Sequence, residues 1–417
     1  MASPAASVEL PLPKDLADRF KRVRADSVAL CDTLAPEDTV VQSMPDVSPT
    51  KWHLAHISWF FETFVLKPYD DSYSAYDEDF HFIFNSYYYT AGQMHARPRR
   101  GLLSRPTLET VMAYRRHVDD AVVGLLEKRD DADIRFRVEL GLHHERQHQE
   151  LMLTDIKHVL SCSPLKPAMS PDLPVPASAP VADYEFIDGL SGTTRIGFDG
   201  EGFSFDNETP RHDALLHPHK MGNRLVTNAE FLEFIRDGAY DTCDLWLSDG
   251  WATIQQHGWN RPLYWSADHQ SEFTLGGVRD LDPHAPVAHV SFYEADAFAR
   301  WSGARLPTEF EWEAQARESE VSGNLLEEGL WHPAASAGSQ FFGDVWEWTS
   351  SAYSAYPGFK PLAGSLGEYN GKFMCNQMTV RGGSCVSAAD HIRPSYRSFF
   401  YPDARWQFLG IRLAKDA

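Results

Sequence analysis

Residues 141–153 read GLHHERQHQELML and residues 50–62 read TKWHLAHISWFFE, and these two stretches decide how the first third of the chain folds. In both stretches the apolar residues recur at helical spacing, which predicts helices with one buried face. His144 and His148 are four residues apart, so their imidazoles share one face of the expected helix. Such a pair can bind one divalent metal ion, but the same spacing also arises by chance in a chain with 18 histidines.

Two further helices are expected beside these. The four are predicted at residues 14 to about 34, 48 to 68, 107 to 129 and 131 to 160. Ser48, followed by Pro49, is predicted to cap the second helix, and Thr107 is predicted to cap the third. Four helices with apolar stripes indicate a four-helix bundle. The connection over residues 69–104 is long for a bundle, and long loops are often functional.

The rest of the chain has a different composition. Residues 161–184 contain many prolines and little that can form a core, so an extended linker is expected there. Residues 185–417 are rich in Gly, Pro, Trp and short β-type runs, with helices expected only within residues 227–238 and 292–317. The sequence therefore predicts two domains, an α domain over residues 1–160 followed by an α+β domain.

Composition excludes several classes of function. The formal net charge is -21, and an acidic surface repels phosphate backbones, so no nucleic-acid partner is expected. The five cysteines are widely spaced and form no CxxC, which favours a cytoplasmic protein without a disulfide framework. The N-terminal residues do not resemble a signal peptide, and no apolar run is long enough to span a membrane.

His56 is the candidate third metal ligand. Its neighbours on the same helical face are aromatic, namely Trp52, Trp59 and Phe60. An unpaired imidazole is costly in such surroundings. His56 is therefore either a core histidine bonded to a backbone carbonyl or a ligand that meets His144 and His148 across the bundle. Three imidazoles leave metal positions open, which suits O2 and substrate on a redox metal or hydrolysis on zinc.

Several acidic residues lie near these histidines in the sequence, such as Glu62, Glu145, Glu150 and Asp155. They are expected either to orient the imidazoles from outside the metal or to be exposed helix charges.

Residues 144–148 also match the HExxH motif of zinc metalloproteases. That interpretation needs a further ligand downstream. Residues 149–154 lack the Gly and His of the metzincin pattern, and the helix runs into the proline-rich segment instead of a second helix with a ligating Glu. A zinc hydrolase is thus the weaker alternative.

The long loop contributes further candidates. Tyr87 and Tyr88 lie in FNSYYYTAG, and Arg97 and Arg100 lie in the following HARPRRGLLSRP. A tyrosine beside an open metal position can donate a proton to a reduced oxygen species, and arginine suits bidentate binding of a carboxylate. The alternatives are packing tyrosines and a solvated basic loop.

These segments together resemble the ergothioneine-biosynthesis sulfoxide synthases, also called hercynine oxygenases. WHLAHISWFFET, FNSYYYTAG and LGLHHERQHQELML are similar to the N-terminal half of that family, a DinB-like helical bundle. PVAHVSFYEADAFARWSGARLPTEFEWEAQAR, FGDVWEWTSSAYSAYPGF and VRGGSCV are similar to the formylglycine-generating-enzyme/sulfatase-modifying domain, which has a C-type-lectin-like fold. The resemblance covers nearly the whole chain.

The resemblance implies a non-heme iron oxidoreductase. Such an enzyme uses Fe(II) and O2 to join the sulfur of cysteine, or of γ-glutamylcysteine, to the imidazole of Nα-trimethylhistidine (hercynine), and its product is a sulfoxide. By the same resemblance His56, His144 and His148 are the iron ligands, and Gln147 contacts the betaine.

The chain departs from the actinobacterial branch of that family near its C-terminus. An Asn-Trp-Asp run precedes Tyr-Pro there, whereas Ser398, Phe399 and Phe400 occupy these substrate-binding positions here. Loss of the carboxylate favours cysteine, or tolerance of both thiols, over γ-glutamylcysteine alone. The phenylalanines are expected to line the betaine pocket, because aromatic faces attract quaternary ammonium groups. In the non-actinobacterial branch the active-site tyrosines resemble Tyr87 and Tyr88.

Two other classes of protein remain as alternatives. A formylglycine-generating thiol oxidase needs a reactive cysteine pair, but Cys385 and Cys375 are not placed as the pair of that family is. A lectin-like module that only binds a ligand predicts no bound iron.

Overall fold

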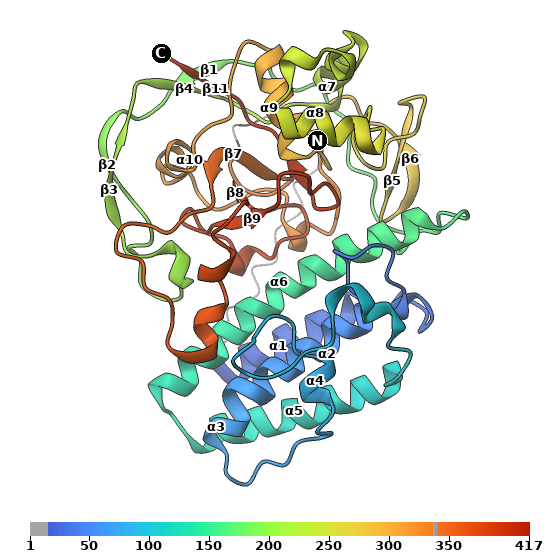
Figure 1. Cartoon of the computed structure of the whole chain (residues 1–417), viewed down its shortest axis with the longest axis vertical. Helices are drawn as coiled ribbons and strands as arrows, with labels where there is room; N and C mark the ends of the chain where they lie inside the picture. The colour runs from blue at the N-terminus through green and yellow to red at the C-terminus, as the bar shows by residue number, and fades with distance from the viewer. Residues whose placement is uncertain (1–15, 337, 339) are drawn as a thin grey trace, which may run out of the picture.

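The first part of the chain is a bundle of four long helices. The computed structural model describes residues 16–336, 338 and 340–417. The bundle helices are α1 (Leu16–Ala29), α2 (Thr50–Phe61), α5 (Leu108–Lys128) and α6 (Ala132–Cys162). Both α1 and α2 pack against α5 and α6 (Figure 1), and buried aromatic side chains such as Phe20, Trp59 and Phe60 fill the interior. The predicted helical bundle is confirmed.

Helix ends agree with the sequence at α5 but not at α2. The Thr107 hydroxyl accepts a hydrogen bond from the Thr110 N–H (3.1 Å) and caps α5, as predicted. The predicted Ser48 cap of α2 is wrong: Pro49 occupies the N-cap position, and the Ser48 hydroxyl instead accepts a bond from Arg100 (2.8 Å).

Helix α2 also continues beyond its predicted end. It passes through a π-helical turn, Glu62–Leu66, into the short helix α3, Lys67–Tyr69. Pro68 therefore lies inside the helical run, in the first turn of α3, where a residue without an N–H is tolerated. The loop after α3 contains one short helix, α4 (Phe80–Ile83), and a 3-10 turn, Arg97–Leu102.

The C-terminal part is an α+β region built on small sheets. No helix or strand is assigned over residues 163–185. A three-stranded antiparallel sheet contains β1 (Phe186–Asp188), β4 (His219–Gly222) and β11 (Ala414–Asp416). A four-stranded sheet has the order β10 (Leu409–Gly410), β7 (Trp346–Ala352), β8 (Met378–Arg381) and β9 (Ser398–Phe400), in which β10 and β7 run parallel. Two hairpins pair β2 (Gly192–Ile196) with β3 (His212–Leu216) and β5 (Ser271–Thr274) with β6 (Gly277–Asp280).

Three helices of this region lie where the sequence predicts them, namely α7 (Asn228–Arg236), α9 (Phe292–Trp301) and α10 (Glu309–Ala316). A fourth, α8 (Ser248–His257), was not predicted. It begins without a side-chain cap and includes Gly250, so its sequence lacks the usual signals of a helix.

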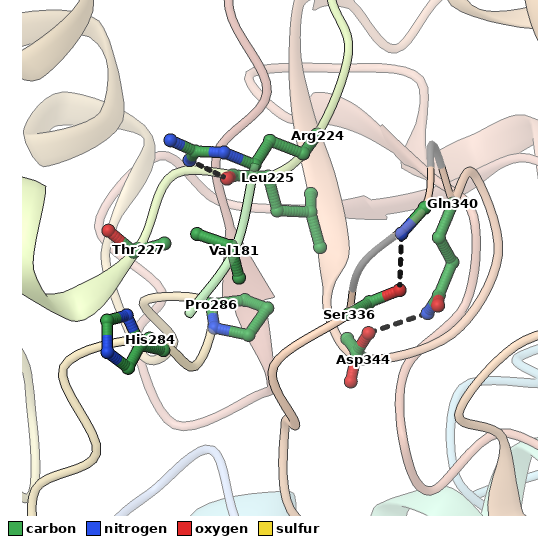
Figure 2. A pocket seen from close by; sticks show the side chains of 10 residues that line it. Val181, Arg224, Leu225, Thr227, His284, Pro286, Ser336, Gln340 and Asp344 are labelled. Atoms are coloured by element: carbon green, nitrogen blue, oxygen red, sulfur yellow. Dashed lines mark hydrogen bonds between the residues drawn. The ribbon is translucent and has the colours of Figure 1, made fainter. Parts of the chain in front are cut away.

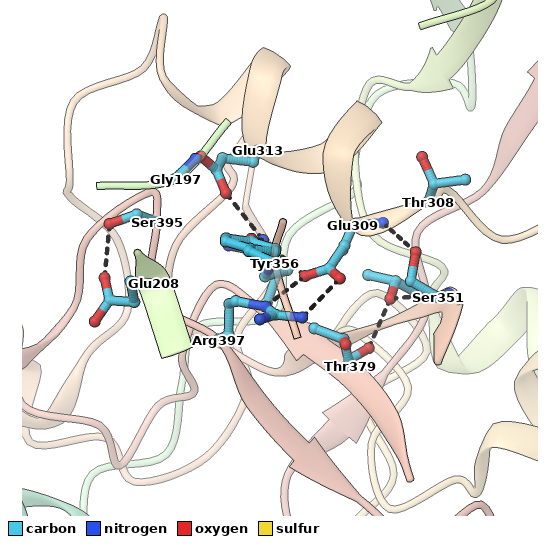
Figure 3. A network of polar contacts seen from close by, with 12 residues as sticks. Gly197, Glu208, Thr308, Glu309, Glu313, Ser351, Tyr356, Thr379, Ser395 and Arg397 are labelled. Atoms are coloured by element: carbon cyan, nitrogen blue, oxygen red, sulfur yellow. Dashed lines mark hydrogen bonds and ion pairs between the residues drawn. The ribbon is translucent and has the colours of Figure 1, made fainter. Parts of the chain in front are cut away.

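A buried ion-pair network attaches α10 to the four-stranded sheet (Figure 3). The Arg397 guanidinium, directly before β9, donates to both carboxylate oxygens of Glu309 (2.8 and 2.9 Å). Arg381, at the end of β8, donates to Glu309 and to Glu313 at 2.9 Å each. Because each of these buried arginines and glutamates has a hydrogen-bonded counter-ion, the cost of removing their charges from water is offset. The network fixes the start of β9, and hence Ser398–Phe400.

Within the bundle, helix α6 lies on the side that faces the C-terminal region (Figure 1). Several of its side chains bond directly to that region, among them Arg146 to Asp390, Glu150 to the Trp346 indole, and Asp155 to the Trp406 indole. Within the described residues, no helix combines the length and the apolar composition needed to cross a membrane.

Candidate metal centre

Three buried histidines converge between α2 and α6. His56 comes from α2, while His144 and His148 share one face of α6. One ring nitrogen from each lies within 4.8 Å of those of the other two. The three ring centroids are 4.5 to 5.1 Å apart. The structure therefore brings together all three histidines that the sequence singles out.

The His56 ring is held in one orientation. It is stacked between the indoles of Trp52 (4.7 Å) and Trp59 (5.5 Å). Its Nδ1 lies 2.6 Å from the carbonyl oxygen of Phe84, so Nδ1 carries the proton and donates it. Nε2 is left with a free lone pair and has no hydrogen-bond partner in the structure. The carbonyl contact of the first interpretation is present, and it leaves Nε2 free, as the second interpretation requires.

The other two imidazoles are also short of partners. Neither nitrogen of His144 has a hydrogen-bond partner, although the residue is only 1% exposed. His148 Nδ1 lies 2.8 Å from His53 Nδ1, and this pairing leaves His148 Nε2 for another ligand. Unpaired buried nitrogens are costly in a native protein unless a ligand satisfies them.

The electrostatics favour neutral imidazoles, the form that binds metals. Burial lowers the pKa of His144 to about 3. Burial, with His144 nearby, places the pKa values of His56 and His148 well below their ordinary range. Burial also lowers the pKa of His53. Three neutral nitrogen donors with free lone pairs fit a divalent transition metal.

The predicted tyrosines lie beside this cluster. Their rings stack at 4.6 Å, and their hydroxyl oxygens are 3.4 Å apart. Tyr88 is fully buried and packs on Trp59 (5.5 Å), whereas Tyr87 is half-buried and faces Tyr369 (6.4 Å). Burial raises the pKa of Tyr87 to about 12, so the phenol keeps its proton at neutral pH.

Gln147 is held by two tyrosines of the C-terminal region. Its Nε2 donates to the Tyr396 hydroxyl (2.7 Å), and its Oε1 accepts from the Tyr369 hydroxyl. The Tyr369 ring also lies 5.5 Å from the His144 ring. The amide keeps one N–H and one lone pair for a substrate.

The two predicted arginines differ in their surroundings. Arg100 is 3% exposed, lies 3.3 Å above the Trp52 ring and donates to the hydroxyls of Ser48 and Ser86. Within the described part of the chain no carboxylate lies within ion-pair distance of it, and burial, with Arg97 nearby, holds its pKa well below the usual value. Arg97 is exposed and donates to the Asp46 carbonyl.

The predicted Ser398, Phe399 and Phe400 form strand β9 and are half-buried. The Phe399 ring stacks on Tyr353 at 4.0 Å and lies 5.9 Å from Phe373. Phe373 in turn contacts Tyr87 at 5.1 Å, so Phe399 is connected to the tyrosine loop through one ring.

Glu62, Glu145, Glu150 and Asp155 are all buried, so none of these four is an exposed helix charge. Glu62 accepts from Tyr73 and Tyr114, and Glu150 accepts from Trp346, Ser384 and Ser387. Only Asp155 contacts the cluster, through His53 Nε2 at 3.0 Å.

Glu145 is part of a separate ion-pair network. Its carboxylate accepts from Ser27 (2.6 Å), Arg115 (3.1 Å) and Arg24 (3.2 Å). Burial raises its pKa, but the charges of Arg24 and Arg115 outweigh that effect and hold the pKa below its ordinary value. The Glu of an HExxH hydrolase must be free to act as a base. This carboxylate is already fully engaged, which argues against the hydrolase.

Two hollows lie near the surface of the C-terminal region. Figure 2 shows the smaller one, of about 20 Å³, in which Gln340 donates to the buried carboxylate of Asp344. It has room for about one water molecule, so it cannot hold an amino-acid substrate. The larger pocket, about 190 Å³, is lined by Phe136 and Leu140 of α6 and by Tyr369. Tyr369 also lies 5.5 Å from His144, so this ring borders both the pocket and the histidine cluster.

Comparison with known proteins identifies the family. Residues 19–152 match the DinB superfamily, and residues 178–338 and 333–417 match the sulfatase-modifying factor enzyme 1-like domain. The chain is 32% identical over 418 residues to the Hercynine oxygenase of Mycolicibacterium smegmatis, which covers 90% of this chain and 92% of that protein. The chain belongs to the hercynine oxygenase family. The Hercynine oxygenase of Mycobacterium tuberculosis is 31% identical over 445 residues, covering 97% and 99% of the two chains.

The chain is also similar, over about half of its length, to a formylglycine-generating enzyme. The formylglycine-generating enzyme of Streptomyces coelicolor is 29% identical to this chain over 289 residues. The match covers 52% of this chain and 84% of that enzyme. Cys385 is fully buried with its pKa raised by burial, while Cys375 is exposed, and neither forms a disulfide. A buried thiol that stays protonated is unreactive, which disfavours a thiol oxidase using this pair.

Sequence reasoning missed three residues that surround the histidine cluster and Gln147. Tyr369 and Tyr396 hold Gln147, and His53 bonds to His148. His53 stands three residues before His56, which is a visible signal, but its partner on α6 is not. The two tyrosines lie more than 200 residues from Gln147, and no local pattern marks them.

Proposed function

We propose that this chain is an Fe(II)- and O2-dependent sulfoxide synthase of ergothioneine biosynthesis. It joins the sulfur of cysteine, or of γ-glutamylcysteine, to the imidazole ring of hercynine. The thiol S–H and the ring C–H each lose hydrogen, one oxygen atom of O2 goes to sulfur, and the other leaves as water. The observation that carries the proposal is the buried cluster of His56, His144 and His148, whose ligand-type nitrogens converge in a chain of the hercynine oxygenase family.

The three imidazoles would hold the iron through nitrogens with free lone pairs. When bound, iron(II) supplies open positions and the electrons with which O2 chemistry begins. The wall formed by Trp52, Trp59 and Phe60 keeps water from the cluster and keeps His56 in place.

The remaining residues bind and orient the two substrates. Arg100, a buried cation with no carboxylate partner among the described residues, is placed to receive a substrate carboxylate. Gln147, fixed by its two tyrosines, offers its free N–H and lone pair to the betaine. Phe399, connected to Tyr87 through the Phe373 ring, is expected to lie beside the trimethylammonium group.

Tyr87 holds the proton that the reaction needs beside the cluster. Its pKa is raised to about 12 by burial, so the hydroxyl is a donor at neutral pH and regains its proton readily. Tyr88 stacks on it and fixes its direction.

Product mass tests this proposal. The full chain, purified without oxygen and loaded with Fe(II), is mixed with hercynine, O2 and either thiol. The expected product is the thiol–hercynine sulfoxide, formed by the wild type and lost in His56→Ala. Conversion of the thiol to its disulfide, with hercynine unchanged under all these conditions, contradicts the proposal.

A further inference from the structure

A continuous hydrogen-bonded chain leads from the C-terminal region to the metal cluster. The Trp406 indole N–H donates to Asp155 Oδ1 at 3.0 Å. Asp155 Oδ2 lies 3.0 Å from His53 Nε2, and His53 Nδ1 lies 2.8 Å from His148 Nδ1. His53 and Asp155 are each 2% exposed, so water does not compete for these bonds.

The donors and acceptors along this chain leave one consistent arrangement of protons. The carboxylate of Asp155 can only accept, and the backbone N–H of Ser48 donates to it as well (2.8 Å). His53 Nε2 must therefore carry a proton, which leaves Nδ1 of the neutral ring as an acceptor. The 2.8 Å contact then requires a proton on His148 Nδ1. His148 Nε2 is left with its lone pair free for a metal.

We propose that His53 and Asp155 are positioning residues that set the tautomer of His148, and that Trp406 links this setting to docking of the C-terminal region. The inference rests on the proposed metal centre. The opposite tautomer would put the proton on His148 Nε2, and that nitrogen could not bind a metal. Because Trp406 belongs to the second half of the chain, the metal site is complete only when the two halves are packed together.

A purely structural role for His53 makes a different prediction. If the side chain only filled space among Trp52 and its neighbours, an apolar residue of similar size would replace it well. If it acts as an acceptor, a smaller polar residue that keeps the acceptor is better. In His53→Asn the amide oxygen can lie near the present position of Nδ1 and accept from His148, whereas His53→Leu has no acceptor.

The test is titration of the metal-free full chain with Co(II) alone, followed by its visible absorption. His53→Leu should bind Co(II) about 10- to 100-fold more weakly than wild type, as is usual when a residue that orients a metal-bound imidazole is lost. His53→Asn should bind more tightly than His53→Leu, even if its melting temperature is lower. Trp406→Phe, which removes the indole N–H together with the five-membered ring but keeps an aromatic side chain, should weaken binding by less than His53→Leu does. His158→Leu is the control, because His158 lies on α6, the helix that carries His148, and bonds Ser43 (2.6 Å) instead of the cluster.

The outcomes separate this inference from the proposed function. Equal Co(II) affinity in wild type and His53→Leu, or no advantage of His53→Asn, overturns the positioning role while leaving sulfoxide formation untouched. Unchanged affinity in Trp406→Phe overturns the link to the C-terminal region. A wild type that binds no Co(II) overturns the metal centre and this inference together. Tight, tautomer-dependent binding in a chain that makes no sulfoxide supports the inference and contradicts only the proposed function.

Discussion

Glu145→Gln separates a structural glutamate from a catalytic one. In the zinc hydrolase interpretation of HExxH, Glu145 is the general base, and its loss removes activity but little stability. In the structure it is the only anion within ion-pair distance of buried Arg115 among the described residues. Its other ionic partner, Arg24, also pairs with Asp119 at 2.6 Å. The substitution therefore leaves one buried guanidinium without a counter-ion.

The expected loss of stability follows from the one buried guanidinium that loses its counter-ion. Removing one partner of a buried pair costs about 3–5 kcal/mol, because the remaining charge stays desolvated. For a unit of roughly 150–250 residues, 1 kcal/mol shifts the melting temperature by about 2–4 °C. The melting temperature of Glu145→Gln should thus fall by about 6–20 °C.

Thermal unfolding of the metal-free chain, followed by circular dichroism, measures this shift. Glu139→Gln is the control on the same helix, since its ion pair with Arg19 is partly exposed and worth about 1 kcal/mol or less. Because the pKa of Glu145 is depressed in the folded state, its stabilisation is present above the ordinary value of 4.5 and is lost as pH falls below it. The difference in melting temperature between wild type and Glu145→Gln should therefore become smaller at acidic pH. A melting temperature within about 2 °C of wild type at neutral pH would refute the structural role.

Three other predictions concern the substrates. Tyr87→Phe or Tyr88→Phe should divert turnover from sulfoxide to thiol disulfide, and wild-type product ratios by mass spectrometry in both variants would refute the tyrosine assignment. Arg100→Lys should raise the KM of the substrate whose carboxylate it binds about tenfold or more, because lysine loses a charged hydrogen bond and the two-pronged geometry of the guanidinium. An unchanged KM for both substrates would count against this role of Arg100. Phe399→Leu should raise KM for hercynine about 2- to 30-fold and spare KM for the thiol, as loss of a cation–π contact implies; equal effects on both would indicate general damage to the pocket.

Features that depend on neighbouring residues in the sequence were predictable. The helical periodicity placed α2, α5 and α6, and the His144/His148 spacing placed two imidazoles on one face. The Thr107 cap is a local interaction and was predicted correctly. The Ser48 cap was predicted wrongly, because the Ser48 hydroxyl accepts a hydrogen bond from Arg100, 52 residues later in the chain.

Features that depend on packing between segments far apart in the sequence were not predictable. Four acids looked equivalent in the sequence, and only the fold shows that Asp155 reaches the cluster while Glu145 balances two arginines. Gln147 was found by resemblance, but the tyrosines that hold it come from distant loops. The period of a helix reports which face is buried, not which partner meets it.

Anomalous diffraction at the iron edge tests the convergence of three imidazoles on one ion most directly. Crystals of the full chain, grown without oxygen in the presence of Fe(II), should show one strong peak among His56, His144 and His148, at about 2.1 Å from one nitrogen of each. A peak at any other group of residues, or none in crystals that diffract well, would contradict the assignment.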